Sequence, residues 1–216
     1  MIGARLAAAI GLSLLAGCGG GSLSGASRAV APPAFGDADP VLWRGPGPEA
    51  HPVHGIDVSR FQGEIDWARA RDAGVSFAFV KATEGGDRVD AAFARNWAGA
   101  AAAGVPRGAY HFYYWCAPAE TQAAWFIANV PRERGALPPV VDLEWNPESP
   151  TCTWRPEPAQ VRAEALRFMD LLEAHYGERP VIYTDPGFFR ENGLIGLAGE
   201  EVWLRAVSAR PEEAYG

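Results

Sequence analysis

The segment Pro139-Val-Val-Asp-Leu-Glu144 decides the fold. It is short and apolar until its last residues, which is typical of a parallel strand buried on both faces of a sheet. Two carboxylates, Asp142 and Glu144, stand at its carboxyl end. The segment therefore predicts a buried strand whose end carries the polar groups of a site.

Similar segments recur from residue 53 onward and alternate with helical patterns. Short apolar runs predict further strands at 54–59, at 75–81, within 105–115, at 179–184 and at 201–205. A three-to-four spacing of apolar residues and Gly or Pro boundaries predict helices at 65–73, 90–103, 118–129 and 158–176. Alternation of strands and helices favours an α/β protein built on a parallel sheet.

Polar and chargeable residues collect at the carboxyl ends of these strands. They are Asp57, the run from Lys81 to Glu84, Tyr110, His111, Asp142, Glu144 and Tyr183. In an α/β barrel that end of the strands carries the active site. An open doubly wound sheet would give the same clustering, so both architectures remain alternatives at this point. The absence of a Gly-x-Gly-x-x-Gly turn after the first strand argues against a dinucleotide-binding fold.

Asp142 and Glu144 are two residues apart on a strand, so their side chains point to the same face, with Cα atoms ~6.6 Å apart. Glycoside hydrolysis needs one protonated carboxyl and a second group that stabilises or attacks the anomeric carbon, and neighbouring carboxylates provide both states. The spacing does not say which acid is protonated. Alternatives are a salt bridge to an Arg or a metal site, but the four His show no ligand spacing.

Composition limits the classes of partner. The chain has 216 residues and a formal net charge of −7, and its basic residues form no cluster. This argues against nucleic-acid binding. Lys81 is the only Lys in the chain, which hints that this position requires a compact ammonium group.

The first 18 residues predict export. Arg5 precedes an apolar run too short to span a bilayer, and the run closes on Leu15-Ala-Gly-Cys18. This end resembles a bacterial lipobox, which predicts a lipid anchor on Cys18, with an ordinary signal peptide as the alternative. Residues 19–52 are rich in Gly, Ser, Ala and Pro and predict a flexible linker. We therefore expect a membrane-anchored lipoprotein, in the periplasm or at the cell surface, whose folded domain spans 53–216.

Two further cysteines, Cys116 and Cys152, both follow predicted strand ends. They predict a disulfide in an exported protein, because that compartment is oxidising. Two buried free thiols are the alternative.

Several ordered motifs resemble glycoside hydrolase family 25. They begin with Asp57-Val-Ser-Arg-Phe-Gln-Gly63, followed by Gly74, Phe79-Val-Lys-Ala-Thr-Glu-Gly85 and Asp90. Gly-Ala-Tyr110-His111-Phe, Pro139 to Glu144, Ile182-Tyr183-Thr184 and Val-Trp203-Leu are similar to the family's third to sixth strands. The resemblance covers residue 53 to the end of the chain, with one departure at Arg88, interpreted as loop variation.

The resemblance implies a lysozyme with a modified, TIM-like (β/α) barrel. It would hydrolyse the β-1,4 bond between N-acetylmuramic acid and N-acetylglucosamine in peptidoglycan, without a cofactor or a metal. By this resemblance Glu144 is the general acid, Asp142 assists the substrate's 2-acetamido group, and Asp57 is a further acid in the cleft. Tyr110, Tyr183 and His111 would contact sugars, and Lys81 and Glu84 would form a polar network near the floor or a structural ion pair.

The family barrel has eight strands, whereas the sequence predicts six. The usual seventh and eighth strands have no match, so we expect an incomplete barrel. This leaves a rival function, a catalytically silent barrel that binds peptidoglycan without cleaving it. A second rival, a cell-wall amidase, is disfavoured because no zinc-ligand pattern is present.

Overall fold

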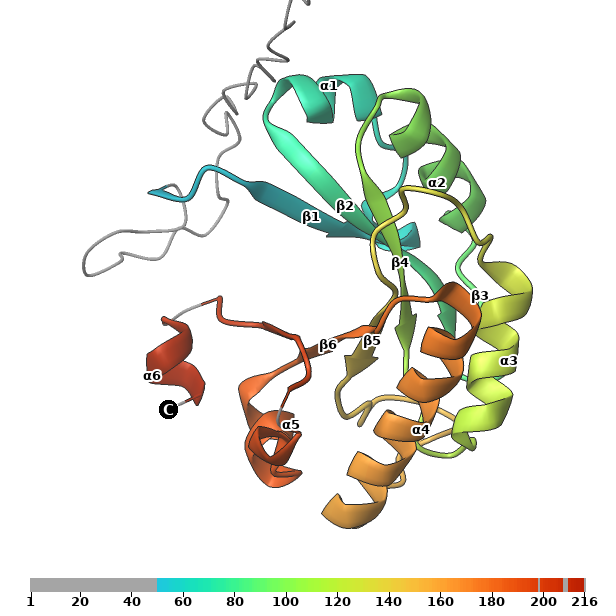
Figure 1. The fold of residues 1–216 in the computed structure, drawn as a ribbon, viewed down its shortest axis with the longest axis vertical. Coiled ribbons are helices and arrows are strands. Elements are labelled where there is room, and N and C mark those ends of the chain that lie inside the picture. Colours follow the sequence, from blue (N-terminus) through green and yellow to red (C-terminus); the bar gives the residue numbers. More distant parts are fainter. Residues whose placement is uncertain (1–49, 198, 208–209, 216) are drawn as a thin grey trace, which may run out of the picture.

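The computed structural model describes residues 50–197, 199–207 and 210–215. The predicted signal sequence 1–18, its Cys18, and all but the last three residues of the predicted linker lie outside the described residues. The remainder forms one curled α/β layer structure (Figure 1).

Six parallel strands form the sheet, in the order β1-β2-β4-β5-β6-β7. Their bounds are β1 His54–Val58, β2 Val75–Glu84, β4 Arg107–Phe112, β5 Val140–Leu143, β6 Val181–Thr184 and β7 Val202–Leu204. All six predicted strands are therefore confirmed. A further strand, β3 (Arg88–Val89), pairs antiparallel with the end of β2, and its two residues are too few to show a hydrophobic pattern. The sheet curls into a half-barrel rather than a flat doubly wound sheet (Figure 1).

Helices connect the strands and cover the convex face of the sheet (Figure 1). The four predicted helices are confirmed as α1 Trp67–Asp72, α2 Phe93–Ala102, α3 Ala119–Asn129 and α4 Pro158–Tyr176. Shorter elements were not predicted: η2 Arg60–Gln62, α5 Pro186–Glu191, η3 Leu194–Gly196 and α6 Pro211–Tyr215. None of the helices among the described residues is long and apolar enough to cross a membrane.

The main core lies between the convex face and helices α3 and α4. Phe126, Phe168 and Leu172 from these helices are fully buried, and so are Val141 and Ile182 from the sheet. Helix α4 has Pro in its first turn, where no backbone N–H is needed, and its C-cap is a Gly in the left-handed region, φ 82°. The core and its helices thus cover the convex face of the sheet. The opposite, concave face is the one available for a site.

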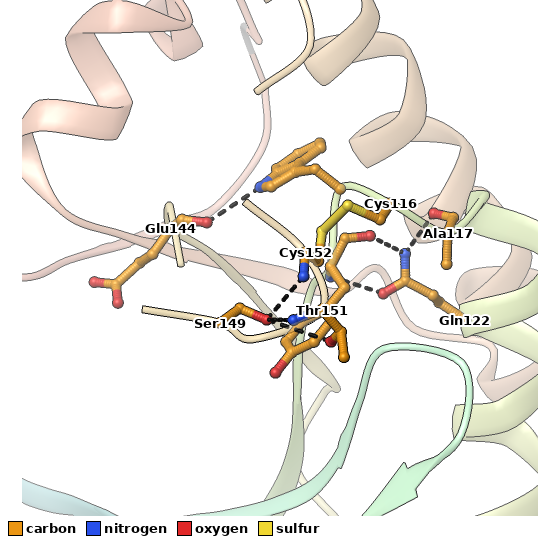
Figure 2. Close-up of a disulfide and its surroundings, with 9 residues drawn as sticks. Cys116, Ala117, Gln122, Glu144, Ser149, Thr151 and Cys152 are labelled. Atoms are coloured by element: carbon orange, nitrogen blue, oxygen red, sulfur yellow. Dashed lines mark hydrogen bonds between the residues drawn. A yellow bond between two sulfur atoms is a disulfide. The ribbon is translucent and has the colours of Figure 1, made fainter. Parts of the chain in front are cut away.

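The disulfide between Cys116 and Cys152 is confirmed, with Cα atoms 5.7 Å apart. It joins the segment after β4 to the long segment after β5. Figure 2 shows this bridge close to the backbone of Glu144, whose carboxylate points away from it. The two segments that follow the central strands are therefore covalently tied beside one of the predicted acids.

Aromatic side chains, Phe79 and Trp203 among them, pack on the concave face of the sheet, and Gly108 leaves room for the Phe79 ring. A Cβ on Gly108 would lie 2.5 Å from Phe79 Cε1 and 3.1 Å from Leu137 Cβ. We expect Gly108→Ala to lower the free energy of unfolding by about 1–3 kcal/mol, because the packed ring cannot retreat without strain. Urea denaturation measures this change. Gly196→Ala is the matched control, since nothing lies within 4 Å of a Cβ there. Equal stability of both variants would contradict the close packing.

Candidate active site

A small pocket opens on the concave face of the sheet. Its walls are Asp57, Tyr110, Val140, Asp142, Glu144, Tyr183 and Trp203. The structure therefore brings together all three predicted acids and both predicted tyrosines, from strands that are far apart in the sequence.

Strand register explains this convergence. Residues paired across neighbouring parallel strands share a face, and Asp142 of β5 pairs with Tyr183 of β6, which in turn pairs with Trp203 of β7. The Trp203 ring centroid lies 5.0 Å from that of Tyr183 and 5.3 Å from that of Phe79. Trp203 was predicted as part of a strand but not as a pocket residue. Its pairing with Tyr183 is the signal that places it there, and this pairing is not visible in the sequence.

Asp142 is the most enclosed of the three acids. Its side-chain atom Oδ1 is buried and has no hydrogen-bond partner within the described part of the chain. Burial, and then the nearby charge of Glu144, raise the pKa of Asp142 well above its ordinary value, while Lys81 opposes this rise. The floor of the pocket therefore holds a carboxyl that retains its proton more readily than an exposed one.

Glu144 and Asp57 have weaker shifts in the same direction. Burial, and then Asp185, raise the pKa of Glu144, and Arg205 opposes them. Burial also raises the pKa of Asp57, and a backbone hydrogen bond and then Arg205 oppose this rise. The electrostatics of the protein thus favours the proton on Asp142 more than on Glu144. Of these two acids Glu144 is the more exposed, so it is the more accessible to a ligand.

The raised pKa of Asp142 has a consequence for stability. A carboxyl whose pKa is higher in the folded than in the unfolded protein binds its proton more tightly when folded. Its contribution to stability therefore falls as pH rises from the ordinary Asp pKa, near 3.8, through the raised pKa of the folded state. Above the raised pKa the carboxyl is ionised in the folded protein, and the stability is then reduced by the full cost of burying this charge.

We therefore expect Asp142→Asn to raise the free energy of unfolding at neutral pH by about 1 kcal/mol, or Tm by roughly 2–4 °C for a chain of this size. Thermal unfolding at several pH values measures the effect. The gain should shrink as pH falls, because the wild-type carboxyl is then neutral in both states. Asp72→Asn, at an exposed position, is the control. A gain that is independent of pH would contradict the assignment of a buried, titrating carboxyl.

Lys81 and Glu84 form an ion pair of 2.5 Å, and Arg88 adds a second contact to Glu84 at 3.3 Å. Neither Lys81 nor Glu84 lines the acid pocket. Strict alternation along a strand would put residues 81 and 84 on opposite faces, but β2 has a register shift between Lys81 and Thr83. This irregularity turns both side chains to the same side. Lys81 and Glu84 therefore form the structural ion pair. Lys81 also affects the pocket, because its charge lowers the pKa of Asp142.

His111 does not lie in the pocket, contrary to the prediction. It is fully buried on the convex side, where its ring stacks on Phe168 with centroids 4.9 Å apart. Its Nδ1 is 2.7 Å from Thr83 Oγ1 and its Nε2 is 3.0 Å from Gln122 Oε1. Burial lowers the pKa of His111 to about 4, so the ring stays neutral. Neighbours on a strand point to opposite faces, so Tyr110 and His111 could not both face the pocket.

Among the residues that the structure describes, no group of three or more His, Cys, Asp or Glu side chains is arranged to hold a metal ion. The polar side chains that line the pocket are the carboxyls of Asp57, Asp142 and Glu144, the phenols of Tyr110 and Tyr183, and the indole of Trp203. Burial is the largest cause of the raised pKa values of Tyr110 and Tyr183, whose phenols remain protonated hydrogen-bond donors at neutral pH.

Residues 56–216 match the sequence model of "Glycosyl hydrolases family 25". The chain belongs to this family. It is similar to the "Uncharacterized protein YegX" of Escherichia coli K12, with 36% identity over 72% of this chain and 56% of the relative. It is also similar to "Lysozyme M1" of Streptomyces globisporus, with 40% identity over 61% of this chain and 46% of the relative.

A solved family 25 glycosyl hydrolase from Bacillus anthracis has the same fold, with a TM-score of 0.68 and 34% identity over 74% of this chain and 72% of that one. The chain spans about half the length of the two curated relatives. Membership of family 25 and the half-barrel fold are thus shown by independent comparisons of sequence and of structure.

Proposed function

We propose that this protein is a peptidoglycan muramidase that hydrolyses the β-1,4 bond between N-acetylmuramic acid and N-acetylglucosamine. The observation that carries the proposal is the convergence of Asp57, Asp142 and Glu144 in one aromatic-walled pocket of a family 25 chain. Similarity to Lysozyme M1 supports the same class of substrate. The proposal needs no cofactor.

Glu144 is assigned as the general acid, because it is partly exposed at the pocket and its pKa is raised. In the first step it donates its proton to the leaving glycosidic oxygen as the bond from that oxygen to the anomeric carbon breaks. The carbonyl oxygen of the substrate's own 2-acetamido group forms the new bond to the anomeric carbon. In the second step water attacks this carbon, Glu144 takes a proton from the water, and the acetamido group is released.

Asp142 is assigned as the partner of the acetamido group. Its unpartnered Oδ1 is a free acceptor at the floor of the pocket, and an acetamido N–H that donates to it would favour the ionised carboxylate. Binding of substrate would therefore lower the pKa of Asp142 and leave the proton of the pair on Glu144. This order of events is consistent both with the larger rise in the pKa of Asp142 before substrate binds and with Glu144 as the proton donor. The charge of Lys81 also lowers the pKa of Asp142.

The remaining pocket residues are assigned to binding. Tyr110 and Tyr183 present protonated phenols, and Trp203 presents an indole beside Tyr183. Such groups can donate hydrogen bonds to sugar hydroxyls and stack against the apolar faces of pyranose rings. Asp57 adds an acceptor on the β1 side.

The test is incubation of the protein with purified peptidoglycan, followed by turbidity and mass spectrometry of the soluble products. The expected products carry new reducing-end muramic acid. New reducing-end glucosamine would instead assign the other glycosidic bond. Binding to peptidoglycan without any new reducing ends would favour the silent binding barrel over the hydrolase.

Export and attachment to a membrane through Cys18 are part of the proposal, and they rest on the lipobox-like end of the leader. Metabolic labelling with a fatty-acid analogue tests the attachment. The label is expected in the full chain and not in Cys18→Ala, and labelling that persists in the variant would refute the anchor.

A further inference from the structure

Arg205 is the first residue after strand β7, two positions beyond Trp203 in the wall of the acid pocket. Its backbone N–H donates a hydrogen bond of 3.0 Å to the carbonyl oxygen of Thr184, so it continues the pairing of β7 with β6. Residues two apart along an extended chain share a face of the sheet. The Arg205 side chain therefore leaves the backbone on the same, concave face as the Trp203 ring.

The backbone of Arg205 is held on both sides of its Cα atom. Besides the bond from its N–H group, its carbonyl oxygen accepts a hydrogen bond of 3.0 Å from the hydroxyl of Tyr215 in helix α6. The same hydroxyl lies 2.7 Å from the carbonyl oxygen of Thr184. None of these bonds uses the guanidinium, so the side chain starts from a fixed point and can be replaced without breaking them.

Arg205 is an exposed cation that forms no ion pair with a carboxylate among the described residues. The other charged groups that act on the pocket acids already have partners. Lys81 is paired with Glu84. The carboxylate of Asp185 accepts hydrogen bonds from two backbone N–H groups at the start of helix α5. The five N–H donors of the Arg205 guanidinium are thus available to an anionic ligand.

The charge of Arg205 reaches the acid pocket. It lowers the pKa of Asp57, on β1, and that of Glu144, just after β5. These two carboxyls come from different walls of the pocket, and both respond to the same guanidinium. A ligand bound between them would therefore feel the charge of Arg205 as well. Three carboxyls line this pocket, so an anionic ligand would be repelled there unless a cation offset them.

The proposed substrate is such a ligand. N-acetylmuramic acid differs from N-acetylglucosamine by a lactyl branch on O3, and this branch ends in a carboxyl group. In a bare glycan the carboxylate is free, and in peptidoglycan it is joined to a stem peptide that has carboxylates of its own. A planar guanidinium binds a carboxylate through two parallel hydrogen bonds, which makes Arg the side chain suited to this group.

We propose that Arg205 binds a carboxylate on the lactyl branch of N-acetylmuramic acid and thereby favours this sugar over N-acetylglucosamine. The inference rests on the proposed function, because that function supplies the substrate. Arg205 is a specificity-determining residue in this scheme, and the proton transfers remain with Glu144.

Calorimetric binding of two matched glycans tests the proposal. Both are the alternating hexasaccharide of N-acetylglucosamine and N-acetylmuramic acid, one with free lactyl carboxylates and one with these groups converted to neutral methylamides. The protein carries Glu144→Gln, so that no cleavage intervenes. It should bind the charged glycan about tenfold more tightly than the neutral one, the lower end of the range for a hydrogen bond to a charged group.

Adding Arg205→Gln should abolish this difference by weakening the binding of the charged glycan alone. Arg205→Lys should retain part of it, because Lys keeps the charge but not the fork of donors. Arg69→Gln is the matched control, at an exposed residue of helix α1 that does not line the pocket, and it should change neither affinity. The Tm of each variant checks that it is folded.

A third glycan, whose lactyl groups carry L-alanyl-γ-D-glutamate, identifies the source of the carboxylate. If Arg205→Gln weakens its binding too, the site accepts carboxylates of the stem peptide. If only the glycan with free lactyl groups loses affinity, the site is specific for the lactyl carboxylate.

Two results would overturn the proposal: an equal loss of affinity for the neutral and the charged glycans, or no loss for any of them. Its failure is distinguishable from failure of the proposed function. A selective loss for a charged glycan, without cleavage of peptidoglycan by the wild-type protein, would keep the role of Arg205 and reject the hydrolase. Cleavage by the wild-type protein, with binding that does not depend on Arg205, would keep the hydrolase and reject the role of Arg205.

Discussion

Replacing Glu144 by Gln is expected to lower the rate of glycan cleavage by about 10²–10⁴-fold, the range of a general acid's contribution. The amide has nearly the same shape but holds no proton that it can give to the leaving oxygen. The measurement is the initial rate of reducing-end release from purified peptidoglycan, with Tm as a check on folding. We expect little change in Tm, because the Glu144 side chain is partly exposed.

Glu148→Gln is the matched control, an identical substitution at an exposed position in the segment that follows β5. It should keep the wild-type rate. In the wild-type protein the rate should also fall as pH rises through the raised pKa of Glu144, because the acid must be protonated to donate. Full activity of Glu144→Gln would remove Glu144 from the mechanism, and Asp142 and Asp57 would then be the remaining candidates for the acid.

Removing the disulfide with Cys116→Ser and Cys152→Ser together is expected to lower the free energy of unfolding by about 3–4 kcal/mol. The bridge closes a loop over a sequence separation of 36 residues, so its loss gives the unfolded chain many more conformations. Cys152 is also buried, and Ser in its place must satisfy a hydroxyl there. Urea unfolding of the double variant and of the wild type measures the difference.

Unfolding of the wild-type protein under reducing conditions is the control, and it should reproduce the loss. The double variant should in addition cleave peptidoglycan more slowly while still folded. Trp115 adjoins Cys116 and binds the Glu144 carbonyl, so a looser segment would hold Glu144 less firmly. Unchanged stability of the double variant would show that the two segments are held by packing alone.

The strands and long helices were predicted from the sequence because their patterns are local. Apolar runs of strand length, Gly and Pro boundaries and the spacing of α4 carry the information within a few residues of each other. Short elements such as β3 and α5 were missed, since each contains too few residues for a period to be seen. The convergence of Asp57, Tyr110 and Tyr183 with the acid pair also followed from sequence, through the rule that parallel strands end at one edge.

The faces of the strands were harder to assign. Alternation separates Tyr110 from His111, but it does not say which of them faces the helices. Packing decides this: the space between the sheet and α4 accepts the His111 ring against Phe168, and Thr83 and Gln122 satisfy its nitrogens. Tyr110 is then left on the concave side.

The sequence by itself thus determined the family, the order of strands and helices, the acid pair Asp142 and Glu144, and the two cysteines of the bridge. Only the tertiary structure decided that Lys81 pairs with Glu84 and that Trp203 lines the acid pocket. These features depend on strand register and on a local irregularity in β2. Each of them is set by contacts between residues distant in the chain, and a local pattern of residues carries no record of such contacts.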